Sequence, residues 1–154
     1  MESRLNPYAV AQDAMKPMMA LEMSVRESGL EHSLIELVKI RASQINRCAF
    51  CLHMHTADAR RAGESEERLY LLGAWRESPL YTARERAALA WTEALTELAR
   101  TGAPDEAWGG LDGHFTEEEK VRLTMLIVAI NGWNRIAVGF RLVHPVAAGE
   151  RKAA

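Results

Sequence analysis

Apolar residues recur at every third or fourth position along most of the chain, which is the spacing of one face of an α-helix. Runs that alternate strictly between apolar and polar residues, as half-buried strands require, are hard to find. The pattern therefore predicts an all-α fold. At 154 residues the chain has the length of one domain of ordinary size, so we expect residues 1–154 to form a single domain.

Proline, glycine and capping residues divide this pattern into helices. Ser33 and Glu36 have capping-box spacing, and so do Thr82 and Glu85, while Thr116 precedes an acidic first turn as an N-cap. Residues 103–115 are rich in glycine and predict a loop with at most one turn. The expected helices cover residues 7–29 with a break or kink near Pro17, then 33–46, 48–63, 65–76, 82–102 and 116–140.

The first and last of these helices have unusual apolar content. The first contains four of the seven methionines, which indicates adaptable packing against a core or a partner subunit: Met15, Met18, Met19 and Met23. From Val121 to Phe140 the last helix is apolar on nearly every side, except around NGWNR. Such a helix belongs in the middle of the molecule or between subunits. Its longest apolar stretch, residues 121–130, includes Arg122 and Thr124 and is too short to cross a bilayer.

Charge and composition narrow the possible partners. Nineteen basic and twenty-one acidic residues are interspersed and give a net charge of −2, so no field favours nucleic acid or an anionic membrane, and we expect neither partner. The N-terminal residues lack the apolar core of a secretory signal, so we expect a cytoplasmic protein. Thiols stay reduced there, which makes a CxxC motif catalytic or metal-binding rather than a structural disulfide.

The candidate chemistry lies in NRCAFCLHMH, residues 46–55, which holds both cysteines. On a helix with about 100° per residue, Cys51 lies about 60° and His55 about 20° from Cys48, so the three share one face. His53 lies about 140° away, which predicts a solvated, packing or subunit-contact role. The free N–H groups at the start of a helix favour a thiolate. The helix dipole favours Cys48 as the reactive sulfur, whereas the histidine one turn later favours Cys51.

Two other interpretations of the cysteines are open. Zinc could use Cys48, Cys51, His53 and His55, but His53 points away from the other three on a helix, and the chain has no second cysteine pair. Alternatively, the two thiols could be buried and inert.

Two charged residues of the preceding helix bear on this site. If the helices at 33–46 and 48–63 form an antiparallel hairpin, Glu36 and His55 are equidistant from the turn, and the carboxylate can orient the imidazole. Alternatively, Glu36 only completes the capping box. Arg41 projects among apolar residues, so we expect it to pair with a carboxylate or to lie at a subunit contact.

The pattern of Glu36, Cys48, Cys51 and His55 resembles the active-site motif of the AhpD-like alkylhydroperoxidases in the carboxymuconolactone decarboxylase superfamily. Residues 37–96 resemble the core of its small peroxidase-related members, and INGWNRIAVGFR near the end adds to the likeness. The resemblance implies an AhpD-like helical bundle with a redox core at about residues 33–100 and assembly into homotrimers or homohexamers, with active sites near subunit contacts.

The resemblance also implies roles. Cys51 attacks a hydroperoxide, Cys48 resolves the sulfenic acid as a disulfide, and His55 and Glu36 relay protons. No cofactor or metal is required, and an external dithiol of the lipoyl or thioredoxin type restores the thiols. One departure is Phe50, which stands where the best-known members have a histidine.

Other functions fit less of the sequence. A non-catalytic redox-responsive oligomer and a general disulfide oxidoreductase use the same CxxC pair. A lactone decarboxylase is suggested by the superfamily name alone, because that chemistry does not require CxxC.

Overall fold

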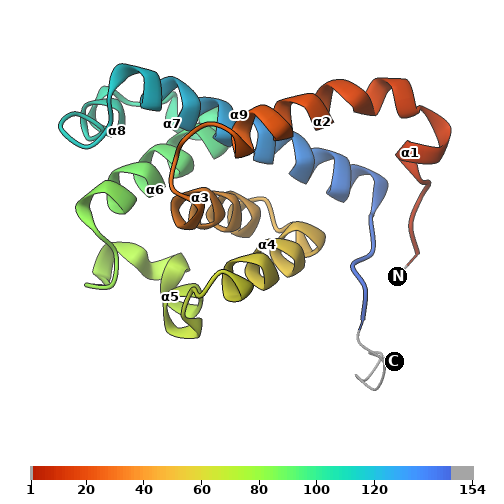
Figure 1. Cartoon of the computed structure of the whole chain (residues 1–154), viewed down its shortest axis with the longest axis horizontal. Helices are drawn as coiled ribbons and strands as arrows, with labels where there is room; N and C mark the ends of the chain where they lie inside the picture. The colour runs from red at the N-terminus through yellow and green to blue at the C-terminus, as the bar shows by residue number, and fades with distance from the viewer. Residues whose placement is uncertain (1, 147–154) are drawn as a thin grey trace.

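The computed structural model describes residues 2–146, which contain helices and no strand, so the all-α prediction is confirmed (Figure 1). The helices are α1 (Pro7–Val10), α2 (Gln12–Arg26), α3 (His32–Ile45), α4 (Ala49–Arg61), α5 (Glu66–Leu71), the 3-10 helix η1 (Leu72–Glu77), α6 (Ala83–Thr96), α7 (Leu98–Thr101), α8 (Asp105–Gly109) and α9 (Glu117–Phe140).

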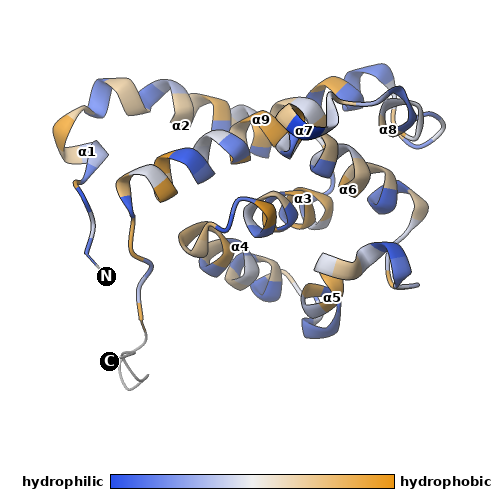
Figure 2. Ribbon diagram, turned by 180° about the vertical axis from the view of Figure 1, so that it is seen from behind, coloured by the Kyte–Doolittle hydropathy of each residue, from blue (hydrophilic) through white to orange (hydrophobic). Residues whose placement is uncertain are grey.

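Helix α3 lies at the centre of the molecule and packs against α4, α6 and α9. Its two apolar faces enter different parts of the core: Leu34 and Val38 pack with α6 and α9, whereas Leu37 and Ile40 pack with α4, α5 and η1. Figure 2 shows hydrophobic and hydrophilic residues interspersed along the helices. A helix with two buried faces explains why charged residues of α3 need partners inside the fold.

Helix α9 is long and apolar enough to cross a membrane by length and composition, the only such helix among residues 2–146. In this structure it is a core helix, because it packs against α2, α3, α4 and α6 and buries large aliphatic side chains such as Leu123, Leu126 and Ile130. At the contact with α2, Gly132 faces Met18: a Cβ atom at Gly132 would lie 2.8 Å from the Cε atom of Met18, so the methionine side chain would have to shift. Together, these contacts hold α2 across α9 beside the start of α4.

Three details of the predicted helices were wrong. The N-terminal break falls at Ala11 and not at Pro17, which lies inside α2. Pro17 forfeits one backbone hydrogen bond, and packing of α2 along α9 keeps the helix continuous. Helix α3 begins one residue before Ser33, with Glu31 as its N-cap and no side-chain cap, so Ser33 and Glu36 form no capping box. A break at Glu97 separates α6 from α7 within the stretch expected to be continuous.

Other local predictions are confirmed. Thr82 with Glu85 and Thr116 with Glu119 form complete capping boxes at the starts of α6 and α9. Arg41 pairs with a carboxylate as expected, because its Nε atom donates to Glu93 Oε1 at 2.7 Å.

Candidate redox-active site

A tight turn between α3 and α4 places the first cysteine. Arg47 has a left-handed φ of 55°, and its N–H donates to the carbonyl of Gln44 at 3.2 Å. The N–H of Cys48 donates to the carbonyl of Ser43 at 3.0 Å, which completes a Schellman motif. Because the chain reverses within these residues, α3 and α4 pack against each other, and Cys48 becomes the N-cap of α4.

The two cysteines meet at the positive end of α4. The backbone N–H of Cys51 donates to Cys48 Sγ at 3.4 Å, and the two Sγ atoms lie 2.7 Å apart. Both are free thiols, and the exposed fractions are 1% for Cys48 and 2% for Cys51. The site therefore holds two reduced sulfurs in direct contact, with one free backbone donor of the helix directed at the first.

His55 and Glu36 form a buried pair across the α3–α4 hairpin. The Nδ1 atom of His55 lies 2.9 Å from Glu36 Oε2, and the exposed fractions are 4% and 6%. An ionised carboxylate only accepts hydrogen bonds, so His55 donates through Nδ1 and keeps Nε2 for other partners. The structure thus brings Glu36 and His55 together as the hairpin argument predicts.

The two sulfurs have opposite electrostatic environments. A hydrogen bond from Cys51, followed by backbone N–H groups at the helix start and the side chain of Asn134, lowers the pKa of Cys48 from its ordinary value of 9.0 to about 7 despite burial. The hydrogen bond to Cys48, burial and the nearby Cys48 charge raise the pKa of Cys51. The resting charge therefore belongs on Cys48, with the proton of Cys51 pointing toward it.

A buried polar network from α3 and α9 supports the cysteines, and the sequence analysis missed it. Asn134, with 1% of its surface exposed, donates to Ser43 Oγ at 3.0 Å and accepts from Asn46 at 2.8 Å. Asn46 also donates to Asn131 at 3.0 Å. Side-chain hydrogen bonds from Asn134 lower the pKa of both sulfurs, and one from Ser43 lowers that of Cys51. The available signal was NGWNR, the one polar interruption of the apolar α9.

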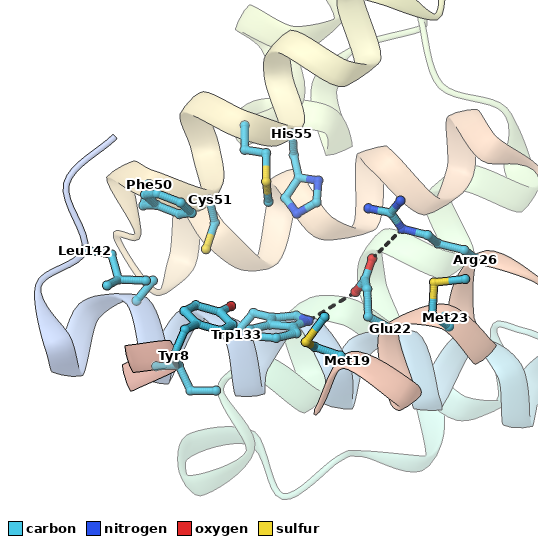
Figure 3. Close-up of a pocket in the computed structure, with 13 residues that line it drawn as sticks. Tyr8, Met19, Glu22, Met23, Arg26, Phe50, Cys51, His55, Trp133 and Leu142 are labelled. Carbon is cyan, nitrogen blue, oxygen red and sulfur yellow. Dashed lines mark hydrogen bonds and ion pairs between the residues drawn. The ribbon is translucent and has the colours of Figure 1, made fainter. Parts of the chain in front are cut away.

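Cys51 and His55 open onto a cavity of about 420 Å³ between α2, α4 and α9. Cys48 does not line it, so of the two sulfurs Cys51 is the one that a bound molecule meets. Figure 3 shows Cys51 and His55 directed from α4 into the same space, with Trp133 opposite. The wall is largely apolar and is formed by Tyr8, Met19, Glu22, Met23, Arg26, Phe50, Met54, Trp133, Ile136, Ala137 and Leu142.

The four candidate zinc ligands do not converge. His53 is exposed and its ring stacks on His144, with 4.6 Å between the ring centroids. A different set is close together: ligand atoms of Glu36, His55 and Asp58 lie within 4.8 Å of one another. These are oxygen and nitrogen donors of the kind that divalent transition metals accept.

Comparisons with known proteins identify related sequences. Residues 12–94 match the sequence model of the carboxymuconolactone decarboxylase family. The chain is 43% identical over 138 residues to the uncharacterized protein YdfG of Bacillus subtilis, a match that covers 90% of this chain and 94% of that protein.

Two solved structures share the fold. One is a protein of unknown function from Agrobacterium tumefaciens, described as a candidate antioxidant defence protein AhpD, with a TM-score of 0.92 and 53% identity over 95% of this chain and 100% of that one. The other is an uncharacterized peroxidase-related protein from Silicibacter, with a TM-score of 0.77 and 23% identity over 88% of this chain and 72% of that one. The second likeness shows the fold alone.

Proposed function

Because this chain belongs to the carboxymuconolactone decarboxylase family and has an AhpD-like fold, we propose that it is a thiol peroxidase that reduces hydroperoxides through Cys48 and Cys51. One observation carries the proposal: two reduced sulfurs lie 2.7 Å apart at a helix start, and one of them lines a cavity beside a histidine held by a buried carboxylate. A structural thiol pair requires neither the cavity nor the histidine.

In the first step Cys51 attacks the hydroperoxide. Its proton passes to the Cys48 thiolate, the nearest base, and the Cys51 sulfur then bonds to the outer oxygen of the hydroperoxide while the O–O bond breaks. The alkoxide leaves as the alcohol with a proton from Nε2 of His55, which takes that proton from solvent while its Nδ1–H keeps the hydrogen bond to Glu36. The products are an alcohol and a sulfenic acid on Cys51.

In the second step Cys48 attacks the Cys51 sulfur, the two form a disulfide, and the Cys48 proton leaves with the hydroxyl as water. One hydroperoxide and two thiols thus give one alcohol, one water and one disulfide. An external dithiol of the lipoyl or thioredoxin type then reduces the disulfide by exchange. In this proposal the protein assembles into a homotrimer or homohexamer and lies in the cytoplasm, where reducing conditions allow the exchange to continue.

Trapping the intermediate tests the assignment of the sulfurs. Cys51→Ser should abolish hydroperoxide consumption, whereas Cys48→Ser should stop after one turnover with a sulfenic acid on Cys51, which dimedone labels for mass spectrometry. Label on Cys48 in the Cys51→Ser protein would reverse the two roles. Reduction of one hydroperoxide per chain, without turnover in the presence of any dithiol and with a change of assembly, would favour a redox-responsive oligomer instead.

A further inference from the structure

The cavity beside Cys51 has two chemically different ends. Figure 3 shows Phe50 and Leu142 near Cys51 at one end and Glu22 with Arg26 at the other, with His55 between them. The side chains that join the two ends are apolar, and they include Met19 and Trp133. A ligand that fills this space would therefore place an apolar body between the sulfur and a charged group.

The charge of Glu22 is already matched inside the protein. Its Oε1 atom accepts from the buried Lys39 Nζ at 2.6 Å, and its Oε2 atom accepts from Trp133 Nε1 at 3.2 Å. Burial opposes ionisation, but hydrogen bonds from Lys39 and Arg26 outweigh it and hold the pKa of Glu22 below its ordinary value of 4.5. Because Lys39 and Glu22 cancel, the charge of Arg26 remains at this end of the cavity.

Arg26 can offer most of its donors to a ligand. Its Nε donates to Glu22 Oε1 at 3.1 Å, while its two Nη atoms have no hydrogen-bond partner among residues 2–146. Its side chain is 61% exposed. Asp58, which lies in the hollow on the other side of Arg26, is paired with Arg61. The free edge of a guanidinium matches a carboxylate, which accepts two parallel hydrogen bonds from it.

We propose that the cavity selects organic hydroperoxides that carry a carboxylate, with the carboxylate on Arg26 and the hydroperoxide at Cys51. This inference rests on the proposed function and specifies its substrate class. Met19, Glu22, Met23 and Arg26 lie at helical spacing on one side of α2. From Met19 to Arg26 the helix rises about 10 Å, so α2 offers a wall of about that length to the apolar chain of a substrate. Fatty acid hydroperoxides have such a chain.

A matched acid and ester pair tests the proposal. The kcat/KM of the wild-type protein should be about tenfold higher for linoleic acid hydroperoxide than for its methyl ester, the effect of one charge-assisted hydrogen-bond pair. Arg26→Gln should remove this preference, so that acid and ester have equal values. Arg122→Gln is the control, because Arg122 makes the same kind of i,i+4 pair with Glu118 on α9, away from the cavity. Equal values for acid and ester in the wild-type protein would overturn the proposal, and so would an unchanged preference in Arg26→Gln.

Equilibrium binding separates this inference from the proposed function. In the Cys51→Ala protein, decanoate should change the tryptophan fluorescence, to which Trp133 contributes from the cavity wall, with about tenfold higher affinity than decan-1-ol. Arg26→Gln should abolish that difference. If this holds while the wild-type protein consumes no hydroperoxide, the carboxylate site stands and the peroxidase proposal fails. If hydroperoxides are consumed but decanoate and decan-1-ol bind equally, the peroxidase stands and the carboxylate site fails.

Discussion

The thiolate of Cys48 gives the sharpest test of the site. A fall in its pKa from 9.0 to about 7 corresponds to about 2.7 kcal/mol in favour of the charged form. A single hydrogen bond to a charged group supplies about 1.5–3 kcal/mol, so the S–H of Cys51 at 2.7 Å can account for most of the change. Near pH 7 about half of Cys48 should be thiolate, whereas an ordinary thiol with a pKa of 9.0 would be roughly 1% ionised.

Ultraviolet absorbance of the thiolate, followed against pH, measures this ionisation directly. The wild-type protein should show one transition near pH 7. Cys51→Ala removes the hydrogen-bond donor and should raise the midpoint most of the way from about 7 to the ordinary value of 9.0. Cys51→Ser keeps an O–H donor and should raise the midpoint less. A single transition above pH 8, or a midpoint that Cys51→Ala does not move, would refute the assignment of the resting charge to Cys48.

The same pKa values predict how stability depends on pH. The pKa of Cys48 is lower in the folded protein, so its contribution is complete above pH 9 and is lost as the pH falls through about 7. The free energy of unfolding should therefore rise by about 2 kcal/mol from pH 7 to pH 9. The pKa of Cys51 is raised in the folded protein, so stability should fall again above pH 9. Urea unfolding at a series of pH values should show this maximum, and Cys48→Ala should lack the rise.

Three further substitutions test neighbouring parts of the site. Glu36→Gln removes the charge beside His55 and should lower peroxide turnover about a hundredfold in a steady-state assay. Ser33→Ala should change neither turnover nor thermal stability, because Ser33 and Glu36 form no capping box. Asn134→Ala leaves buried polar partners unpaired and should lower the free energy of unfolding in urea by about 2 kcal/mol; a loss below 0.5 kcal/mol would show that water replaces the amide. Arg47→Gly removes the backbone strain of a non-glycine residue with a left-handed φ and should raise the free energy of unfolding by about 1 kcal/mol, measured by thermal unfolding. A decrease would mean that the turn is not strained.

The sequence was sufficient for elements that depend on local spacing. The CxxCxxxH spacing lies within a short segment, so helical geometry alone predicts that Cys48, Cys51 and His55 share a face. Glu36 could be reached as well, because a tight hairpin fixes which residues of two helices lie level. Spacing alone wrongly predicted that Glu36 completes a capping box. Ser33 and Glu36 have the right spacing, but α3 begins one residue earlier, at His32.

Contacts between distant segments could not be predicted in this way. Asn134 reaches Ser43 from 91 positions along the chain, and no periodicity relates the two. The cavity depends on α2, which packs against α9, where Met18 lies against Gly132. Neither the position of α2 nor the charge balance around Glu22 follows from spacing. The polar network and the carboxylate end of the cavity therefore appear only when the helices are packed.

Phe50 changes how protons can move in this site. It packs against Cys48 and Cys51 and lines the cavity, at the position where the resemblance leads one to expect a histidine. His53 cannot replace that histidine, because it is exposed and stacks on His144. His55 is then the one imidazole among residues 2–146 that lines the cavity.

Since Cys48 takes the proton of Cys51 directly, the His55–Glu36 pair has one remaining task, which is to protonate the leaving alkoxide. Alcohols of high pKa need that proton most, so loss of His55 should slow alkyl hydroperoxides more than peroxy acids, whose leaving groups are stable as anions.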